Sequence, residues 1–258
     1  MLENQLDLFI ADFVDVTPKG EMTTMEHPIF SLSTKPDLEV FRYEFKDQFL
    51  EVIPSGKGRA TIFDKDLLLY CIGQLKKGEI SGREPSRAVK ITSYDFLKST
   101  GRHTGGRQYK LLADSLVRLR GTTFRTDILD KGRRKARIFG LIEEGKIAER
   151  DSDGRFMDLI VVLPEWLHEA VSENRILAYN RDYFSLRQPN QRRMYELCRK
   201  HCGNQDVWHI SFNRLYEKFG TRASKYEFKR SLKSMVEAQK IPDYQLELVD
   251  DVVFVTQK

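Results

Sequence analysis

The segment AVKITSYDFLKSTGRHTGGRQYKLLADSLVRLRG, residues 88–121, carries the most informative pattern in this chain of 258 residues. Capping residues and glycines divide it into short apolar-periodic pieces, which is typical of helices and strands joined by tight turns. The pieces predict a strand over 88–91, a helix over 94–99 capped by Ser93, a turn over 101–106 and a helix over 107–119. This order predicts a helix-turn-helix unit that follows a strand.

The same order of elements recurs in the C-terminal half. Residues 207–210 predict a strand, Ser211 caps a short helix that ends at Gly220, and Ser224 opens a helix that runs to about Gln239. A helix precedes each copy and a hairpin follows it, so one order of elements occurs twice. The preceding helices are predicted over 64–77, capped by Asp64, and over 189–202, opened by Pro189.

We therefore predict an α+β fold of two tandem winged-helix domains with a flexible N-terminal tail. The predicted boundaries are 1–25 for the acidic tail, 26–175 for the first winged-helix domain and 176–258 for the second. In the first domain, 122–129 and 135–142 are expected to pair as a basic wing, with 157–163 as a later strand. In the second domain, 244–248 and 252–255 are expected to form the closing hairpin.

Positive charge is concentrated in two separate blocks, although the formal net charge is only +5. Residues 1–50 contain ten acidic and four basic side chains, whereas residues 101–137 contain eleven basic and three acidic ones. Residues 181–240 contain fourteen basic and six acidic ones. Each basic block includes the second helix of a predicted helix-turn-helix unit, so the distribution indicates nucleic-acid binding.

Both of these helices are predicted to have an apolar face and a cationic face. The apolar positions are Tyr109, Leu112, Leu116 and Leu119 in the first helix, and Phe228, Leu232 and Met235 in the second. Helical geometry then turns Arg107, Lys110 and Arg118 outward in the first, with Asp114 among them. In a helix-turn-helix protein, the outward face of the second helix enters the major groove of DNA.

We expect DNA contacts from these helices, from the turns before them and from the basic hairpin. The predicted residues are Arg102, Arg107, Lys110, Arg118, Arg120, Arg125, Arg133, Arg134, Arg137, Arg222, Lys225, Tyr226, Lys229, Arg230 and Lys233. The acidic pair at 250–251 predicts that the C-terminal wing contacts DNA weakly or not at all. Solvated helix faces are the alternative interpretation, because charged outer faces are common on surface helices.

A short motif stands out near the N-terminus. Gln5-Leu6-Asp7-Leu8-Phe9 matches the pentapeptide by which bacterial replication proteins bind the sliding clamp of the polymerase. The glutamine amide can hydrogen-bond to the edge of a cleft, and the apolar side chains can fill a groove. The alternative is a tail segment that packs on its own domain.

Three segments resemble the plasmid replication initiator protein A family, which is similar to the wider group of tandem winged-helix plasmid Rep proteins. They are NRDYFSLR at 180–187, RRMYELCRKHCG at 192–203 and LVRLRGTT at 116–123, and the resemblance covers about residues 25–258. It implies binding to repeated double-stranded origin sequences, origin opening, and recruitment of the host initiator ATPase and replicative helicase. It also implies a monomer that initiates and a dimer that represses or inactivates.

Catalytic signatures are missing from the sequence. There is no His-x-His pair for a rolling-circle nickase and no Gly-x4-Gly-Lys-Ser/Thr loop for a P-loop ATPase, so we predict neither an enzyme nor a cofactor. Cys198, His201 and Cys202 hint at zinc, but a fourth ligand is missing. A transcriptional repressor is the alternative function, and a nuclease or recombinase with dispersed carboxylates is the third.

The remaining sequence features indicate a cytoplasmic protein without a membrane anchor. The chain has only three cysteines, which provide no disulfide framework and suggest a reducing compartment. No apolar run is long enough to span a bilayer, and residues 1–4 lack the basic start of a signal peptide.

Overall fold

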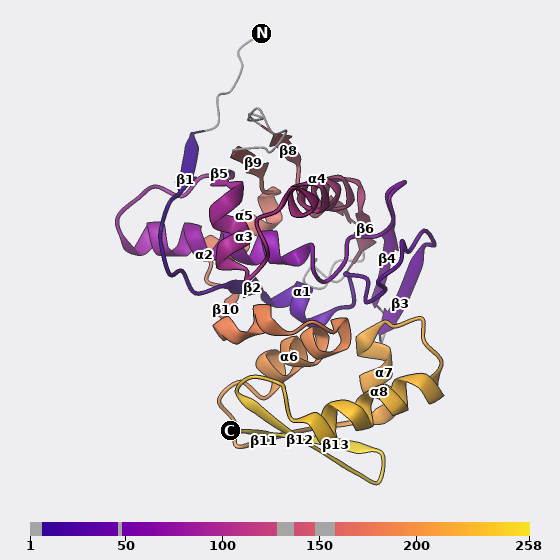
Figure 1. Ribbon diagram of the computed structural model, residues 1–258. Coiled ribbons are helices and arrows are strands. Elements are labelled where there is room, and N and C mark those ends of the chain that lie inside the picture. Colours follow the sequence, from indigo (N-terminus) through magenta and orange to yellow (C-terminus); the bar gives the residue numbers. More distant parts are fainter. Residues whose placement is uncertain (1–6, 46–47, 128–136, 148–157) are drawn as a thin grey trace.

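Two helix-turn-helix units lie one above the other in Figure 1, which shows the computed structural model of the chain. The structure describes residues 7–45, 48–127, 137–147 and 158–258. The first unit contains α2 (Lys65–Ile80), β5 (Ala88–Thr92), α3 (Ser93–Ser99), α4 (Gly106–Gly121), β8 (Glu144–Ile147) and β9 (Asp158–Val162). The second contains α6 (Pro189–His201), β11 (Val207–Ser211), α7 (Phe212–Phe219), α8 (Lys225–Ala238), β12 (Tyr244–Val249) and β13 (Val252–Gln257).

The two units have the same strand pairing. In each one, the last strand lies between the other two, so the orders are β5-β9-β8 and β11-β13-β12, and all these pairs are antiparallel. Ser211 and Ser224 cap α7 and α8 as predicted, whereas α3 begins after Thr92 rather than after Ser93. The repeated order read from the sequence is therefore present in both halves of the structure.

The first predicted hairpin belongs to a different sheet, so its assignment as the wing of the first unit is wrong. β6 (Thr123–Thr126) and β7 (Arg137–Gly140) join β3 (Phe41–Phe45) and β4 (Gln48–Ile53) in the order β3-β4-β6-β7. Phe124 and Phe139 stack at 5.4 Å between ring centroids, and both rings pack against Trp166 of α5 (Glu165–Ser172). This aromatic contact packs the hairpin against α5, away from β5. The strands β8 and β9 take the place in the first unit that the sequence assigned to this hairpin.

Residues 7–25 are not the flexible tail that the sequence predicted. β1 (Leu8–Ala11) pairs in parallel with β5, and Phe9 and Ala11 are both 4% exposed. The ring of Phe9 fills the space above Gly78, where a Cβ atom would lie 2.5 Å from Phe9 Cε2. Because alternate residues of this strand face inward and a glycine leaves room for the aromatic ring, the segment docks as an edge strand with Phe9 and Ala11 buried.

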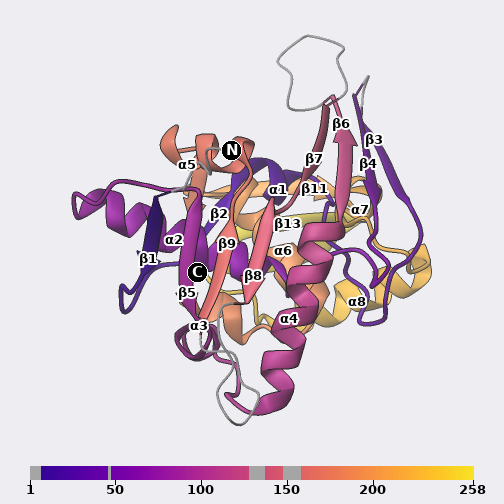
Figure 2. The same ribbon diagram turned by 90° about the horizontal axis from the view of Figure 1, so that it is seen from above.

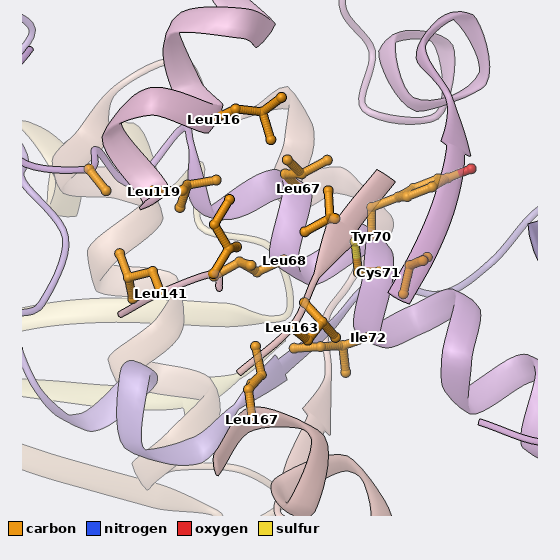
Figure 3. Packing of buried hydrophobic residues seen from close by; sticks show 14 of the residues in the cluster. Leu67, Leu68, Tyr70, Cys71, Ile72, Leu116, Leu119, Leu141, Leu163 and Leu167 are labelled. Atoms are coloured by element: carbon orange, nitrogen blue, oxygen red, sulfur yellow. The ribbon is translucent and has the colours of Figure 1, made fainter. Parts of the chain in front are cut away.

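The residues that follow β1 tie the two units together. β2 (Lys19–Glu21) pairs antiparallel with β10 (Ile176–Ala178), and α1 (Met22–Glu26) packs on α6. Met25 and Leu69 of the N-terminal half belong to the second apolar core, beside Tyr179 and Tyr183, the latter in the short helix η1 (Arg181–Ser185). The first core gathers around α2 and α4, as Figure 3 shows for Leu67, Leu68, Leu116 and Leu119.

Buried ion pairs cross the boundary between the units. Lys65 Nζ of α2 lies 2.7 Å from Glu196 Oε1 of α6, and both side chains are at most 2% exposed. The hydroxyls of Tyr179 and Tyr183 also donate to Glu196 Oε1, at 3.1 and 3.3 Å. Charges at this depth are tolerated only when they are paired, so these contacts hold the two units in one relative position. No helix in the described part of the chain is long and apolar enough to cross a bilayer.

Candidate nucleic-acid interface

The second helix of the first unit, α4, has the two faces that the sequence predicted. Tyr109, Leu112, Leu116 and Leu119 are at most 7% exposed, which confirms the apolar face. Arg107 and Lys110 lie exposed on the opposite face. The helix follows Gly105, which provides no side-chain capping bond, and the amide of Gln108 in its first turn donates to the carbonyl of Gly105 at 2.8 Å.

An aspartate on the same helix is offset by a lysine that the sequence analysis missed. Lys57, in the turn after β4, forms an ion pair with Asp114 and donates a hydrogen bond to it. That hydrogen bond is the main cause that holds the pKa of Asp114 below its usual range. The outer face of α4 is therefore less repulsive to phosphate than its sequence suggests.

Four of the predicted DNA-binding arginines form ion pairs with acids of the chain, namely Arg102, Arg118, Arg125 and Arg222. The expectation that Arg118 points outward into solvent is wrong. Arg118 donates from Nε and Nη2 to both carboxylate oxygens of Asp64, each at 2.7 Å, and its side chain is 18% exposed. The sequence assigned the Asp64 carboxylate to capping α2, but this carboxylate makes no capping bond and pairs with Arg118. The hydrogen bond to Asp64 is the main cause that raises the pKa of Arg118. Position 118 faces the start of α2 rather than solvent, because the helical period rotates it to the flank of α4.

Arg102 and Arg222 have comparable structural roles. Arg102 Nη2 donates to Asp66 and to the carbonyl of Phe63, both at 2.7 Å, so this side chain anchors the turn before α4. Arg222, in the turn before α8, pairs with Asp37 and Glu39, each at 2.9 Å. Both arginines position a turn through acids that are distant in the sequence.

The second helix of the other unit, α8, also confirms the predicted faces. Phe228, Leu232 and Met235 are at most 2% exposed, whereas Tyr226 is 79% exposed. Arg230 and Lys233 are exposed beside Tyr226, but Lys229 pairs with Asp251 at 2.6 Å and Lys225 donates to Asn213. The acidic turn between β12 and β13 therefore neutralises one flank of α8.

The other predicted cations lie at or beyond the end of α4. Arg120 is exposed in the last turn of α4. Arg125 on β6 pairs with Glu51, and the Arg137 guanidinium lies over the ring of Phe139 on β7. Arg133 and Arg134 lie outside the described residues.

The turns before α4 and α8 face one shared segment of the chain. Residues 33–36 border a cavity of about 630 Å³ that reaches the turn 100–103. Residues 31–35 and Asp37 border another of about 470 Å³ that reaches the turn 220–223. Both helices lie in the lower right part of Figure 2. Lys35, Lys57 and Arg187, which sequence periodicity does not single out, line the larger of these two cavities.

The N-terminal pentapeptide is only partly described. Gln5 and Leu6 lie outside the described residues, Asp7 and Leu8 are exposed, and Phe9, within β1, is buried. Of the three residues considered for zinc, Cys198 and Cys202 are in the second core, and His201 faces Glu26 at 2.7 Å.

Comparisons with known proteins place this arrangement in a family. Residues 19–246 match the model of replication initiator protein A, so the chain belongs to the replication initiator protein A family. A relative from Wigglesworthia glossinidia brevipalpis, described as "Putative replication protein", is 40% identical over 245 residues, which are 93% of this chain and 88% of the relative. The family assigns the chain to replication initiation.

Solved structures share the fold across both units. Domains 2 and 3 of RctB superpose with a TM-score of 0.64 and 15% identity over 91% of this chain and 96% of that one. A second crystal structure of the same RctB domains has a TM-score of 0.56, with 16% identity over 92% and 96% of the two chains. At this identity the likeness concerns the fold alone.

Proposed function

We propose that this protein is a non-enzymatic plasmid replication initiator that binds repeated origin sequences in double-stranded DNA through two winged-helix units. The observation that carries the proposal is the pair of exposed cationic helix faces on α4 and α8, each the second helix of a helix-turn-helix unit, in a member of the replication initiator family. By family resemblance it also helps to open the origin, recruits the host initiator ATPase and helicase, and exchanges between monomer and dimer.

The physical logic of two readers follows from groove geometry. A major groove about 12 Å wide admits one helix, and one helix covers only a few base pairs. Arg107 and Arg230 can each donate two hydrogen bonds to a guanine edge, while the lysines beside them meet phosphates. Linking two readers raises the effective concentration of the second at its half-site, so the pair binds more tightly than either unit alone.

Autonomous replication tests this function. A plasmid that carries the candidate origin and this gene is expected to replicate, and the purified protein is expected to protect the origin repeats from nuclease digestion. A repressor would protect its operator but would not support replication, and a nuclease or recombinase would cleave or join the DNA only with a divalent metal ion. Protection without replication would therefore favour the repressor.

We further propose that Gln5–Phe9 binds the host sliding clamp. Phe9 is 4% exposed in the docked position of β1, so clamp binding requires β1 to separate from β5. Gly78→Ala places a methyl group against the Phe9 ring, 2.5 Å from Cε2, and overpacking of this kind costs about 1–3 kcal/mol. We expect this variant to bind purified clamp about tenfold more tightly, because the binding-competent population rises.

Limited proteolysis and a double variant control the clamp experiment. Proteolysis between residues 7 and 18 should become faster in Gly78→Ala, which verifies that β1 is displaced. Adding Phe9→Ala should abolish clamp binding in the same background, since the groove then loses an apolar anchor. A displaced β1 with unchanged or absent clamp affinity would refute the clamp proposal and leave the DNA-binding proposal intact.

A further inference from the structure

The cavity of about 630 Å³ beside α4 is formed by both units, and we call it the junction cavity. The first unit contributes the turn 100–103 and one flank of α4, including Gln108 and Leu111. The second unit contributes Arg187 and Arg192, which flank the start of α6. Arg187 Nη2 donates to the carbonyl of Gly101 at 3.2 Å, so a residue of the second unit is seated on the turn of the first.

Its lining is strongly cationic. Seven lysine and arginine side chains line it, against the single acid Asp64. The other acids that pair with these cations are Asp37, Asp66 and Asp114, so seven positive charges face four negative ones and three remain. Asp37 is also shared with Arg222 of the neighbouring turn, which weakens the compensation further. A half-enclosed cavity lined mainly by positive charge focuses the electric field and attracts an anion.

One of the lining side chains is an incompletely matched guanidinium. Arg59 is 1% exposed and pairs with Asp37 through Nη2 at 3.1 Å, but its buried Nε and Nη1 have no hydrogen-bond partner among the described residues. Burial is the main cause that lowers the pKa of Arg59 to about 10. Buried donors that lack acceptors are energetically unfavourable, and an anion that reached them would offset that cost.

We propose that the junction cavity binds a backbone phosphate of the DNA strand that passes between α4 and α8. This inference rests on the proposed function and adds a contact at the junction of the two units. A helix in the major groove is flanked by both phosphate backbones, and the flank of α4 that bears Gln108 and Leu111 faces the cavity. Lys35, Lys57 and Arg187 are exposed in its lining and supply donors for that phosphate.

The proposed phosphate contact depends on the relative position of the two units. Because Arg187 reaches the phosphate from the second unit while Lys57 reaches it from the first, one phosphate is held only when both units keep their relative position. A free phosphate compound would satisfy the same chemistry, so the experiment must separate a backbone phosphate from a small ligand.

Arg187→Ala tests the site, with Arg181→Ala as the matched control. Both arginines are exposed and lie in the same short segment, but Arg181 pairs with Asp15 and lines a different cavity. On origin DNA, we expect Arg187→Ala to bind about tenfold more weakly and to reduce the slope of affinity against salt by about one, and Arg181→Ala to match the wild type.

A neutral phosphate completes the test. Ethylation interference first identifies the phosphate, between the two half-sites, at which modification blocks binding of the wild-type protein. A methylphosphonate is then placed at that position. The methylphosphonate should lower the DNA affinity of the wild type about tenfold and should not lower that of Arg187→Ala further. The reason is that the substitution and the methylphosphonate remove the same contact. Equal losses in the two proteins, or unchanged affinity of Arg187→Ala, would overturn the assignment.

Pyrophosphate titrated into the DNA-free protein distinguishes the source of the phosphate. Weak, Arg187-dependent binding that competes with origin DNA supports the backbone assignment. Arg187-dependent binding that leaves DNA affinity unchanged overturns it in favour of a small ligand. If the wild type fails to bind origin DNA at all, the proposed function fails, and the backbone assignment fails with it, while the pyrophosphate titration still reports on the cavity.

Discussion

Asp66→Ala is expected to lower the free energy of unfolding by about 3–5 kcal/mol, the usual cost of removing one partner of a buried ion pair. Asp66 is fully buried at 0% exposed. Its carboxylate accepts from Arg102 of the turn before α4 and from Arg192 of α6. The substitution leaves the buried guanidinium of Arg192 and the part-buried one of Arg102 without this partner. Urea denaturation followed by circular dichroism measures the change.

Asp95→Ala is the control for this prediction, because it removes the same charge from an exposed position of α3. We expect it to change stability by less than about 0.5 kcal/mol. Removing an acid from a DNA-binding protein generally strengthens binding, since repulsion falls. Asp66→Ala should instead weaken origin binding, even at temperatures below the melting temperature of the variant. The reason is that α4 and α6 lose the carboxylate that anchors them both. Similar stability for the two variants would show that the Asp66 pairs contribute little.

Arg107→Ala combined with Arg230→Ala is expected to weaken specific origin binding about 100-fold or more. Each exposed arginine that reads a guanine contributes about 1–3 kcal/mol, and the two helices act on one linked site. Thermal stability should stay within about 2 °C of the wild type, because neither side chain has a buried contact to lose. Fluorescence anisotropy on origin and unrelated duplexes measures both affinities.

Arg42→Ala is the control, since Arg42 on β3 is 77% exposed and lies outside both helix-turn-helix units. It should leave the ratio of specific to non-specific affinity unchanged. If the double variant lost affinity equally on both duplexes, α4 and α8 would be phosphate-binding helices without base contacts. Arg118→Ala differs from both, because loss of the Asp64 pair should lower stability as well as binding.

The sequence alone predicted the repeated helix-turn-helix order and the buried faces of α4 and α8. These features depend on local geometry, since an apolar side chain at every third or fourth position must share one helix face. It also located the two cationic blocks and the segments that resemble the replication initiator family. The residue type at each helix position was sufficient for all of this.

Only the tertiary structure decided which strands pair and which cations remain exposed. Phe124 and Phe139 meet Trp166, and Phe9 meets Gly78, through packing that no local period encodes. Arg118 and Arg102 find their aspartates 54 and 36 positions away in the chain. Such pairs form because the fold brings distant side chains within contact distance, and burial then makes an unpaired charge too costly to tolerate.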